Sequence, residues 1–324
     1  MTDIRLPPSL TLAHYRLTLK VLETLYLPPF KGSALRGGFG HTFKRLVCIQ
    51  SKPCGDRCVL GNACPYGYVF ETSPPKDSEV LSTHEAVPRP FVIEPPSDRR
   101  REIPAGERLT FGLTLVGRCI NYLPYFVAVF RELGDVGLGR SRGKYRLLAV
   151  DAVPPYGGPK RPIYRAEEDV VRTADSTVGV AEILAQASTL PCDRLTVRFL
   201  TPARLKHAGR YAQDTVEFHV LVRALLRRVS SLAYFHCGAR WETDYRGWVE
   251  RAQGVEAVDT HLSWMEWGRR SGRQKRRIEM GGVVGSVTYA GDLAPFRPLL
   301  ALGMLVHVGK GAVLGNGQYV VNGE

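Results

Sequence analysis

Four short stretches of this 324-residue chain hold the residue types that most suggest chemistry, and the first is rich in cysteine. Cys48, Cys54, Cys58 and Cys64 follow one another in the pattern C-x5-C-x3-C-x5-C. Four thiolates suffice for a tetrahedral zinc ion or an iron–sulfur cluster. Two local disulfides and reduced loop cysteines are the alternatives. We expect the four residues to lie together in one excursion of the chain, with zinc as a structural clip if they hold a metal.

A histidine with cations around it is the second feature. The stretch that begins at Arg36, RGGFGHTFKR, places His41 close to Arg36, Lys44 and Arg45. Such a histidine can act as an acid or a base on a phosphodiester, although a lone helical histidine is more often structural. The chain has no H-E-x-x-H, G-x-S-x-G or acidic metal cluster, which disfavours metalloproteases, α/β-hydrolases and two-metal nucleases.

The third feature is a run of cations beside two tryptophans. Six cations fall within nine residues: Arg269, Arg270, Arg273, Lys275, Arg276 and Arg277. Arginine presents a planar fork to phosphate, and Trp264 and Trp267 offer stacking faces for bases. The alternative is a solvated loop, but charges of one sign repel one another and need a partner. We therefore expect this run to contact RNA or DNA.

A glycine loop near the C-terminus is the fourth feature. Its residues include Gly309, Lys310, Gly311, Gly315 and Gly317. Glycines let backbone N–H groups approach a phosphate, so we expect this loop to bind a nucleic-acid backbone. The loop has neither the order of a P-loop nor that of a dinucleotide fingerprint. A tight helix-to-strand turn is the alternative explanation.

Charge and composition agree with a nucleic-acid partner. The net charge is +13, and hydrophobic residues make up 44% of the chain, as in ordinary globular proteins. A strong excess of clustered arginine is typical of proteins that bind polyanions. The sequence has no apolar run long enough to span a bilayer, and its N-terminus lacks the apolar core of a signal peptide. We expect a soluble, cytoplasmic protein with no membrane partner.

An internal repeat predicts the fold that must position these features. Gly137, Gly139 and Gly143 match Gly309, Gly311 and Gly315 at a constant offset, and each set follows a short apolar helix. Each half also begins with a strand and a helix, and has one further strand before that apolar helix. The predicted elements are a strand from His14, a helix over 33–47, a strand over 109–116, a strand from Arg194, a helix over 215–235 and a strand over 283–289.

The order strand, helix, strands, helix, strand is that of a ferredoxin-like, RRM-like unit. We therefore predict an α+β protein with two tandem ferredoxin-like domains and a Cys-rich excursion in the first. The predicted domains are residues 1–176 and 177–324. The stretch 151–176 is interpreted as a linker or surface excursion, and the proline-rich stretch 74–104 as extended or edge structure.

These residues carry a resemblance to a known family. The sequence resembles the CRISPR-associated RAMP endoribonucleases that process precursor CRISPR RNA. The similar stretches are 281–321, 31–48, 64–71, 225–238 and 271–282. The resemblance implies two RRM-like domains and cleavage of CRISPR repeat RNA without a metal cofactor. The 2′-hydroxyl attacks the adjacent phosphate and leaves a 2′,3′-cyclic phosphate and a 5′-hydroxyl.

The resemblance also implies roles for particular residues. The family's general acid–base histidine lies in or near the first helix, which corresponds to His41. A tyrosine upstream and a lysine downstream sometimes complete the site, for which Tyr26 and Lys44 are the counterparts. Arg36, the arginine run and the glycine loop are the expected RNA contacts. A non-catalytic RAMP subunit that holds guide RNA among other effector subunits is the alternative, and a zinc-organised structural protein is a third.

Overall fold

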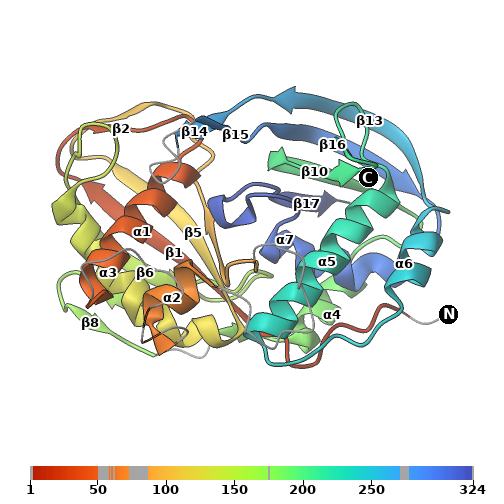
Figure 1. Ribbon diagram of the computed structural model, residues 1–324, viewed down its shortest axis with the longest axis horizontal. Helices are drawn as coiled ribbons and strands as arrows, with labels where there is room; N and C mark the ends of the chain where they lie inside the picture. Colours follow the sequence, from red (N-terminus) through yellow and green to blue (C-terminus); the bar gives the residue numbers. More distant parts are fainter. Residues whose placement is uncertain are drawn as a thin grey trace. The chain divides into compact units, whose positions relative to one another are not determined.

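The chain forms two compact units in a computed structural model, which describes residues 3–49, 58, 60, 63–72, 87–173, 176–270 and 277–322. The N-terminal unit comprises Leu12–Thr177 and Phe235–Cys237. The C-terminal unit comprises Met1–Thr11, Val178–Tyr234 and Gly238–Glu324. Figure 1 labels their elements.

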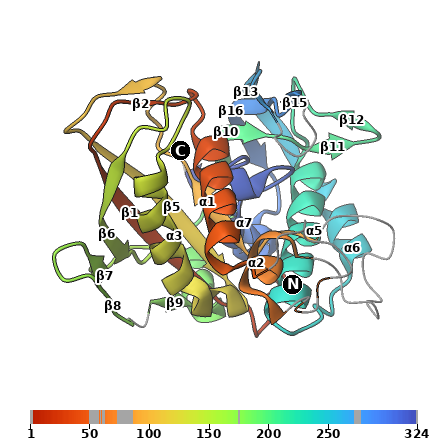
Figure 2. The same ribbon diagram turned by 60° about the vertical axis from the view of Figure 1, so that its left-hand side comes forward.

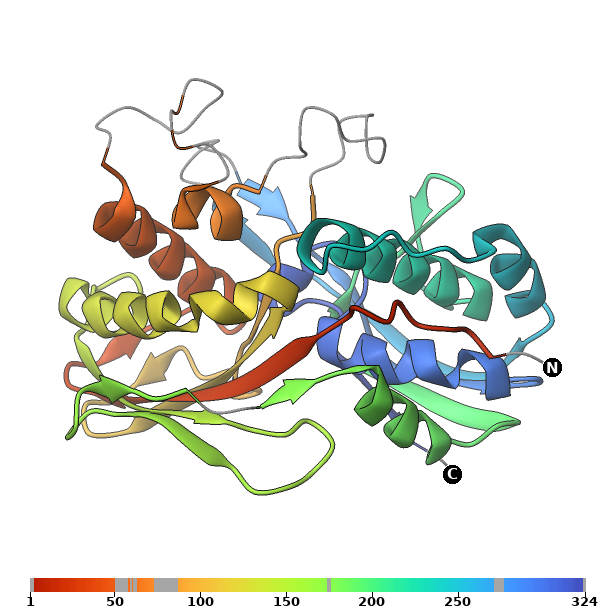
Figure 3. The same ribbon diagram turned by 90° about the horizontal axis from the view of Figure 1, so that it is seen from below.

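The N-terminal unit is built around a ferredoxin-like sheet. Its core elements are β1 (Leu12–Val21), α1 (Gly32–Val47), β3 (Phe91–Glu94), β5 (Arg108–Val116), α3 (Leu123–Val136) and β6 (Tyr145–Ala152). The strands pair antiparallel in the order β3-β5-β1-β6. Helices α1 and α3 cover one face of this sheet (Figure 3). The predicted strand, helix, strands, helix, strand order is confirmed for this half.

Alternating side chains explain why β1 forms and which face it buries. Tyr15, Leu17, Leu19 and Val21 are all at most 2% exposed, as the period-two pattern predicts. Phe39 of α1 packs above the sheet, and its ring stacks on that of Phe126 from α3 with centroids 4.6 Å apart. The first helix is therefore fixed on the sheet by its aromatic face.

The C-terminal unit repeats this arrangement. Its core elements are β10 (Arg194–Ala203), α5 (Phe218–His236), β13 (Glu256–Met265), β16 (Gly282–Ala290), α7 (Arg297–Val306) and β17 (Tyr319–Asn322). The strand order β13-β16-β10-β17 is again ferredoxin-like, with antiparallel pairing. The described part of this unit also contains the α-helices α4 (Val180–Ser188) and α6 (Tyr245–Ala252). The predicted pair of ferredoxin-like folds is thus confirmed.

Short additional strand pairs occur in both units. In the N-terminal unit, β2 (Leu25–Tyr26) pairs with β4 (Glu102–Ile103), and α2 (Pro65–Phe70) precedes β3. In the C-terminal unit, β11 (Lys206–His207) pairs with β12 (Arg210–Tyr211), and β14 (Gly268–Arg270) pairs with β15 (Arg277–Glu279). Strand β2 lies between β1 and α1, and the β11–β12 hairpin lies between β10 and α5. Figure 2 shows the β11–β12 hairpin next to α5.

The stretch 151–176 contains sheet structure, so its interpretation as a linker is wrong. It holds β7 (Arg161–Arg165) and β8 (Val170–Val171), which continue the N-terminal sheet beyond β6. Strand β9 (Thr177–Val178) pairs with β1. Ile163 and Tyr164 are 1% and 3% exposed, so burial of two apolar side chains overrides the turn-rich composition.

Two short segments belong to the unit distant from them in sequence. The first residues pack with the C-terminal unit, where the Trp241 indole donates to the carbonyl of Arg5. The end of α5 packs with the N-terminal unit, where the His236 ring bonds the carbonyl of Pro88 and the hydroxyl of Tyr68. The observed division at Val178 otherwise lies next to the expected one.

The described helices are short or interrupted by charge. Helix α5 has 19 residues and carries Arg223, Arg227 and Arg228. Within the part of the chain that the structure describes, no helix has both the length and the apolar character needed to cross a membrane.

Candidate active site

His41 lies on the outer strip of α1, and its side chain is exposed. The helix packs on α2 through one edge, where Arg36 and Lys44 lie over the rings of Phe70 and Tyr66. Residues three and four apart share a helix face, so His41 falls between this edge and the one that faces α3. Its imidazole makes no hydrogen bond or ion pair with any residue that the structure describes, and it is directed toward solvent.

Three glycines of α1 explain how this strip stays open. A Cβ at Gly40 would lie 2.0 Å from the ring of Phe70, and one at Gly38 would lie 2.9 Å from Leu133. These two glycines therefore permit close packing on α2 and α3. A Cβ at Gly37 would meet nothing within 4 Å. Gly37 lies one turn before His41, so the surface beside the imidazole is bare helix backbone that a substrate can approach.

Tyr26 is held by backbone contacts in β2. Its carbonyl accepts from the amide of Arg140 at 3.1 Å, and a Cβ at Gly139 would lie 2.5 Å from the same carbonyl. Tyr26 is 47% exposed. The first glycine turn of the repeat thus supports the segment that carries Tyr26, and it leaves the Arg140 and Arg142 side chains exposed beside that segment.

Lys31 is a buried residue that sequence analysis missed. It is 0% exposed and directly precedes α1. Its ammonium donates to the carbonyls of Asp98 and Arg100, the latter at 2.9 Å. Burial lowers the pKa of Lys31, while the nearby Asp98 carboxylate opposes that shift. The lysine ties the start of α1 to the segment before β4, the partner strand of Tyr26; its only sequence signal is a charge just before a helix.

The three predicted catalytic residues are not joined to one another. No hydrogen bond links Tyr26, His41 and Lys44 in the described structure. The Lys44 ammonium lies 5.9 Å from the centroid of the Tyr66 ring, along the α2 edge. Arg45, one turn after His41, forms an ion pair with Glu132 of α3. Lys44, three residues after His41, is not paired with a carboxylate of any residue that the structure describes.

Two other histidines are excluded from chemistry by burial. His236 is 3% exposed and both of its ring nitrogens face protein partners. His307 is 0% exposed, and its Nδ1 lies 3.3 Å from the carbonyl of Asn316. A substrate cannot reach either ring in this fold.

The C-terminal glycine loop has buried and exposed parts. Gly315 and Gly317 are buried, and their amides donate to the carbonyls of Ala312 and Pro202. Lys310 is exposed, with Gly309 and Gly311 half-buried on either side. A phosphate can therefore reach the residues from Gly309 to Gly311. The buried Gly315 and Gly317 support the turn instead.

The arginine run and the cysteine cluster lie partly outside the described residues. Arg269 and Arg270 belong to β14 and Arg277 belongs to β15, and these two strands pair antiparallel. Arg273, Lys275 and Arg276 lie outside the described residues, as does Cys54. No three of the cysteines that the structure describes have sulfurs close enough to share one ion. The zinc clip at Cys48, Cys54, Cys58 and Cys64 stays a prediction.

The two halves of the chain match two family models. Residues 10–176 match the model named AF_1859_N, described as an N-terminal domain. Residues 197–319 match the model described as CRISPR-associated endoribonuclease Cas6. The chain belongs to the AF_1859_N family, and its C-terminal part matches the Cas6 model. The resemblance to CRISPR-associated RAMP endoribonucleases is thereby confirmed.

Known proteins agree with this Cas6 assignment at the level of the fold. The Thermus thermophilus Cas6 TTHB231, in a product complex, is 17% identical, with a TM-score of 0.56 over 96% of this chain and 99% of that one. A product complex of Cas6 TTHA0078 is 15% identical, with a TM-score of 0.53 over 97% and 100%. A partial Cas6-RT-Cas1–Cas2 complex is 14% identical, with a TM-score of 0.60 over 98% and 47%.

One relative is similar in sequence. An uncharacterized protein of Archaeoglobus fulgidus is 33% identical over 129 residues. The match spans 40% of this chain and 42% of that relative. It covers less than half of either protein.

Proposed function

We propose that this protein is a Cas6-type endoribonuclease that cuts CRISPR repeat RNA to give mature guide RNA. The observation that carries the proposal is the exposed His41 beside the bare backbone at Gly37. An RNA strand that crosses this strip of α1 would bring a phosphodiester within reach of the imidazole. The Cas6 domain of the C-terminal unit and the net charge of +13 support an RNA substrate.

The cleavage chemistry follows from a single phosphodiester and its neighbouring ribose. The 2′-oxygen attacks phosphorus and loses its proton, the bond from phosphorus to the 5′-oxygen breaks, and the 5′-oxygen takes up a proton. His41 transfers one of these protons, which contributes roughly 10²–10⁴ in rate. Tyr26 is the proposed second proton-transfer group. Lys44 would release the Tyr66 ring and stabilise the charge that develops on phosphate oxygens.

RNA binding is assigned to cations outside this strip. Arg36 remains a candidate contact, since its guanidinium lies at the edge of α1, 4.0 Å from the Phe70 ring centroid. In the C-terminal unit we assign phosphate contact to Lys310 with Gly309 and Gly311, and to the β14–β15 hairpin. Contact with other CRISPR effector subunits is a further prediction. No cofactor is needed for the proposed cleavage.

The direct test uses labelled repeat RNA. We expect the purified protein to make one discrete cut in the presence of EDTA, and mass spectrometry of the products to show 2′,3′-cyclic phosphate and 5′-hydroxyl ends. Tight binding with no cut would favour the alternative, a subunit that holds guide RNA without cleaving it. Cleavage that EDTA abolishes would contradict the proposed chemistry.

A further inference from the structure

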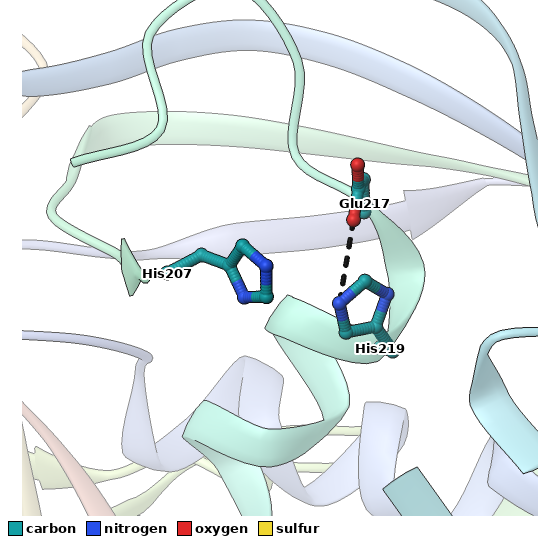
Figure 4. Close-up of side chains that lie close together, drawn as sticks. All are labelled: His207, Glu217 and His219. Carbon is teal, nitrogen blue, oxygen red and sulfur yellow. Dashed lines mark ion pairs between the residues drawn. The ribbon is translucent and has the colours of Figure 1, made fainter. Parts of the chain in front are cut away.

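Three potential metal ligands meet where the β11–β12 hairpin approaches α5. His207 is the last residue of β11, Glu217 directly precedes α5, and His219 is in its first turn. Figure 4 shows the three side chains directed toward one another. Sequence analysis did not single out this group, because nine residues lie between His207 and Glu217 and only the hairpin brings them together.

The spacing of the ligand atoms fits a shared ion. One nitrogen or oxygen from each residue lies within 4.8 Å of the other two. The Glu217 Oε2 and the His219 Nε2 are 3.3 Å apart. Two ligands at the usual zinc distances of about 2.0–2.1 Å, in tetrahedral geometry, are separated by about 3.3–3.4 Å. The third ligand needs only a small movement of the exposed His207 side chain.

The same spacing argues against an acid–base pair that cleaves RNA. An acid and a base that act on opposite sides of a phosphate must flank the entering and leaving oxygens, which requires nitrogens roughly 6–8 Å apart. The ring centroids of His207 and His219 are 5.1 Å apart, and their facing atoms are closer. A phosphate does not fit between them, whereas a metal ion does.

The charged residues around the group and the types of its ligands indicate which kind of metal it can bind. The cations near the group are Lys206 and Arg210 on the hairpin and Arg223 on α5. The carboxylates are Glu217 and, across a cavity of about 570 Å³ that Glu217 and His219 also line, Glu256. Calcium and magnesium need several oxygen ligands, which this group lacks. Imidazole nitrogens with one carboxylate suit zinc, cobalt, nickel or copper.

We propose that His207, Glu217 and His219 form a binding site for a divalent transition metal of the zinc type. The ion ties the β11–β12 hairpin to the start of α5, and the cavity gives it access from solvent. Three protein ligands leave a coordination position for water or a small ligand. The proposal does not depend on the nuclease activity, because the site and its test are separate from the chemistry at His41.

Arg223 competes with the metal. Its guanidinium lies 3.0 Å from the Nδ1 of His207, so Nδ1 accepts a hydrogen bond and Nε2 carries the proton. A metal on Nε2 requires that proton to move to Nδ1, and Arg223 must then withdraw. Glutamine at this position offers an oxygen that can accept from Nδ1–H, which is the usual support of a ligating histidine. We therefore expect Arg223→Gln to raise metal affinity.

The test measures Co²⁺ binding to the full chain without a polyhistidine tag, by visible absorption and calorimetry. We expect about one equivalent at a site with nitrogen and oxygen ligands, which lacks the thiolate charge-transfer bands of a cysteine site. Zn²⁺ should displace the Co²⁺ and raise the melting midpoint, since it binds the folded state only. Thiolate bands would instead report the predicted cysteine clip, so the two sites are distinguishable.

Variants identify the ligands. His207→Ala, Glu217→Gln and His219→Ala should each weaken binding by at least the roughly 10–100-fold that loss of an outer-shell partner costs, and Arg223→Gln should tighten it. His261→Ala is the matched control, because His261 Nε2 lies 3.2 Å from the Asp259 carboxylate but has no third ligand among the described residues. Unchanged melting in EDTA shows that the variants fold. The proposal is overturned if His207→Ala and His219→Ala bind Co²⁺ as tightly as the wild type. It is also overturned if His261→Ala loses as much Co²⁺ affinity as they do.

Discussion

The two units place their glycine turns in the same way but present different chemistry beside them. In the N-terminal unit, Gly139 packs against the carbonyl of Tyr26, and the Arg140 amide donates to that carbonyl. In the C-terminal unit, Gly309 packs against the carbonyl of Arg204, which accepts from the amide of Lys310. Each turn supports the segment that comes after the first strand of its unit. The repeated glycines are thus explained first by this close approach, and only secondarily by a ligand.

The segment after the first strand differs between the units. In the N-terminal unit it carries Tyr26 and leads to a helix whose outer strip has His41 beside the bare Gly37. In the C-terminal unit it folds into the β11–β12 hairpin and leads to a helix whose start carries Glu217 and His219. The N-terminal unit offers the exposed imidazole of His41, whereas the C-terminal unit offers a cluster of potential metal ligands. We therefore assign RNA cleavage to the N-terminal unit and metal binding to the C-terminal unit.

The largest expected effect separates the histidines of the two units. His41→Ala should slow single-turnover cleavage of repeat RNA by roughly 10²–10⁴-fold while leaving RNA affinity nearly unchanged, because a proton-transfer group acts in the transition state. His219→Ala, the matched change in the C-terminal unit, should cleave at the wild-type rate. Full activity of His41→Ala would contradict the assignment of chemistry to the N-terminal unit.

The second effect tests whether the C-terminal glycine turn is needed for the fold. A Cβ at Gly317, where φ is +69°, would lie 1.8 Å from the carbonyl oxygen of Val308. Gly317→Ala should lower the free energy of unfolding by about 2–5 kcal/mol, from strain and from overpacking together. Gly209→Ala is the control, since its φ is +82° but nothing lies within 4 Å. Denaturant unfolding measures both variants. An equal loss of unfolding free energy in Gly317→Ala and Gly209→Ala would contradict the packing argument.

The third effect concerns the basic hairpin. Replacing Arg273, Arg276 and Arg277 together with glutamine should weaken RNA binding and flatten its salt dependence. Each lost phosphate contact lowers the slope of log affinity against log salt by roughly 0.7–0.9. Filter binding across a salt series measures the slope. An affinity and slope equal to those of the wild type would show that this hairpin is a solvated surface feature.

The smallest effect probes the open strip of α1. Gly37→Ala should stabilise the fold by up to about 1 kcal/mol, because alanine favours a helix and its Cβ meets nothing. Gly40→Ala should instead destabilise it by about 1–3 kcal/mol through overlap with the ring of Phe70. Thermal unfolding measures the direction of the stability change in both variants. If RNA crosses the strip as proposed, Gly37→Ala also slows cleavage; an unchanged rate would place the RNA elsewhere.

Much of the fold could be predicted because the repeated elements have recognisable local sequence patterns. Alternation from Tyr15 to Val21 predicted β1 and its buried face. The predicted helices over 33–47 and 215–235 agree with α1 and α5 to within a few residues. The strands β7 and β8 were not predicted, since Ile163 and Tyr164 stand among glycines and prolines and are recruited by the neighbouring sheet edge. The local composition of a segment does not show that another part of the chain provides a sheet edge with which it can pair.

The candidate site was predicted in part. Cations around a histidine on the first helix indicated His41, but the sequence could not decide between it, His236 and His307 by exposure. Burial decides this: His236 and His307 are enclosed by protein partners, while His41 faces solvent. Lys31 was missed because its two partners are backbone carbonyls, which have no signature in a sequence.

The sequence by itself determined the duplicated ferredoxin-like fold, the basic character and the glycine turns, because each depends on periodicity, charge or the absence of a Cβ at one position. Only the tertiary structure decided which glycines are packing sites, which histidines a substrate can reach, and that His207 meets Glu217 and His219. These depend on distances between residues remote in the chain. Such distances are set by burial and hydrogen bonding across elements, which no local pattern records.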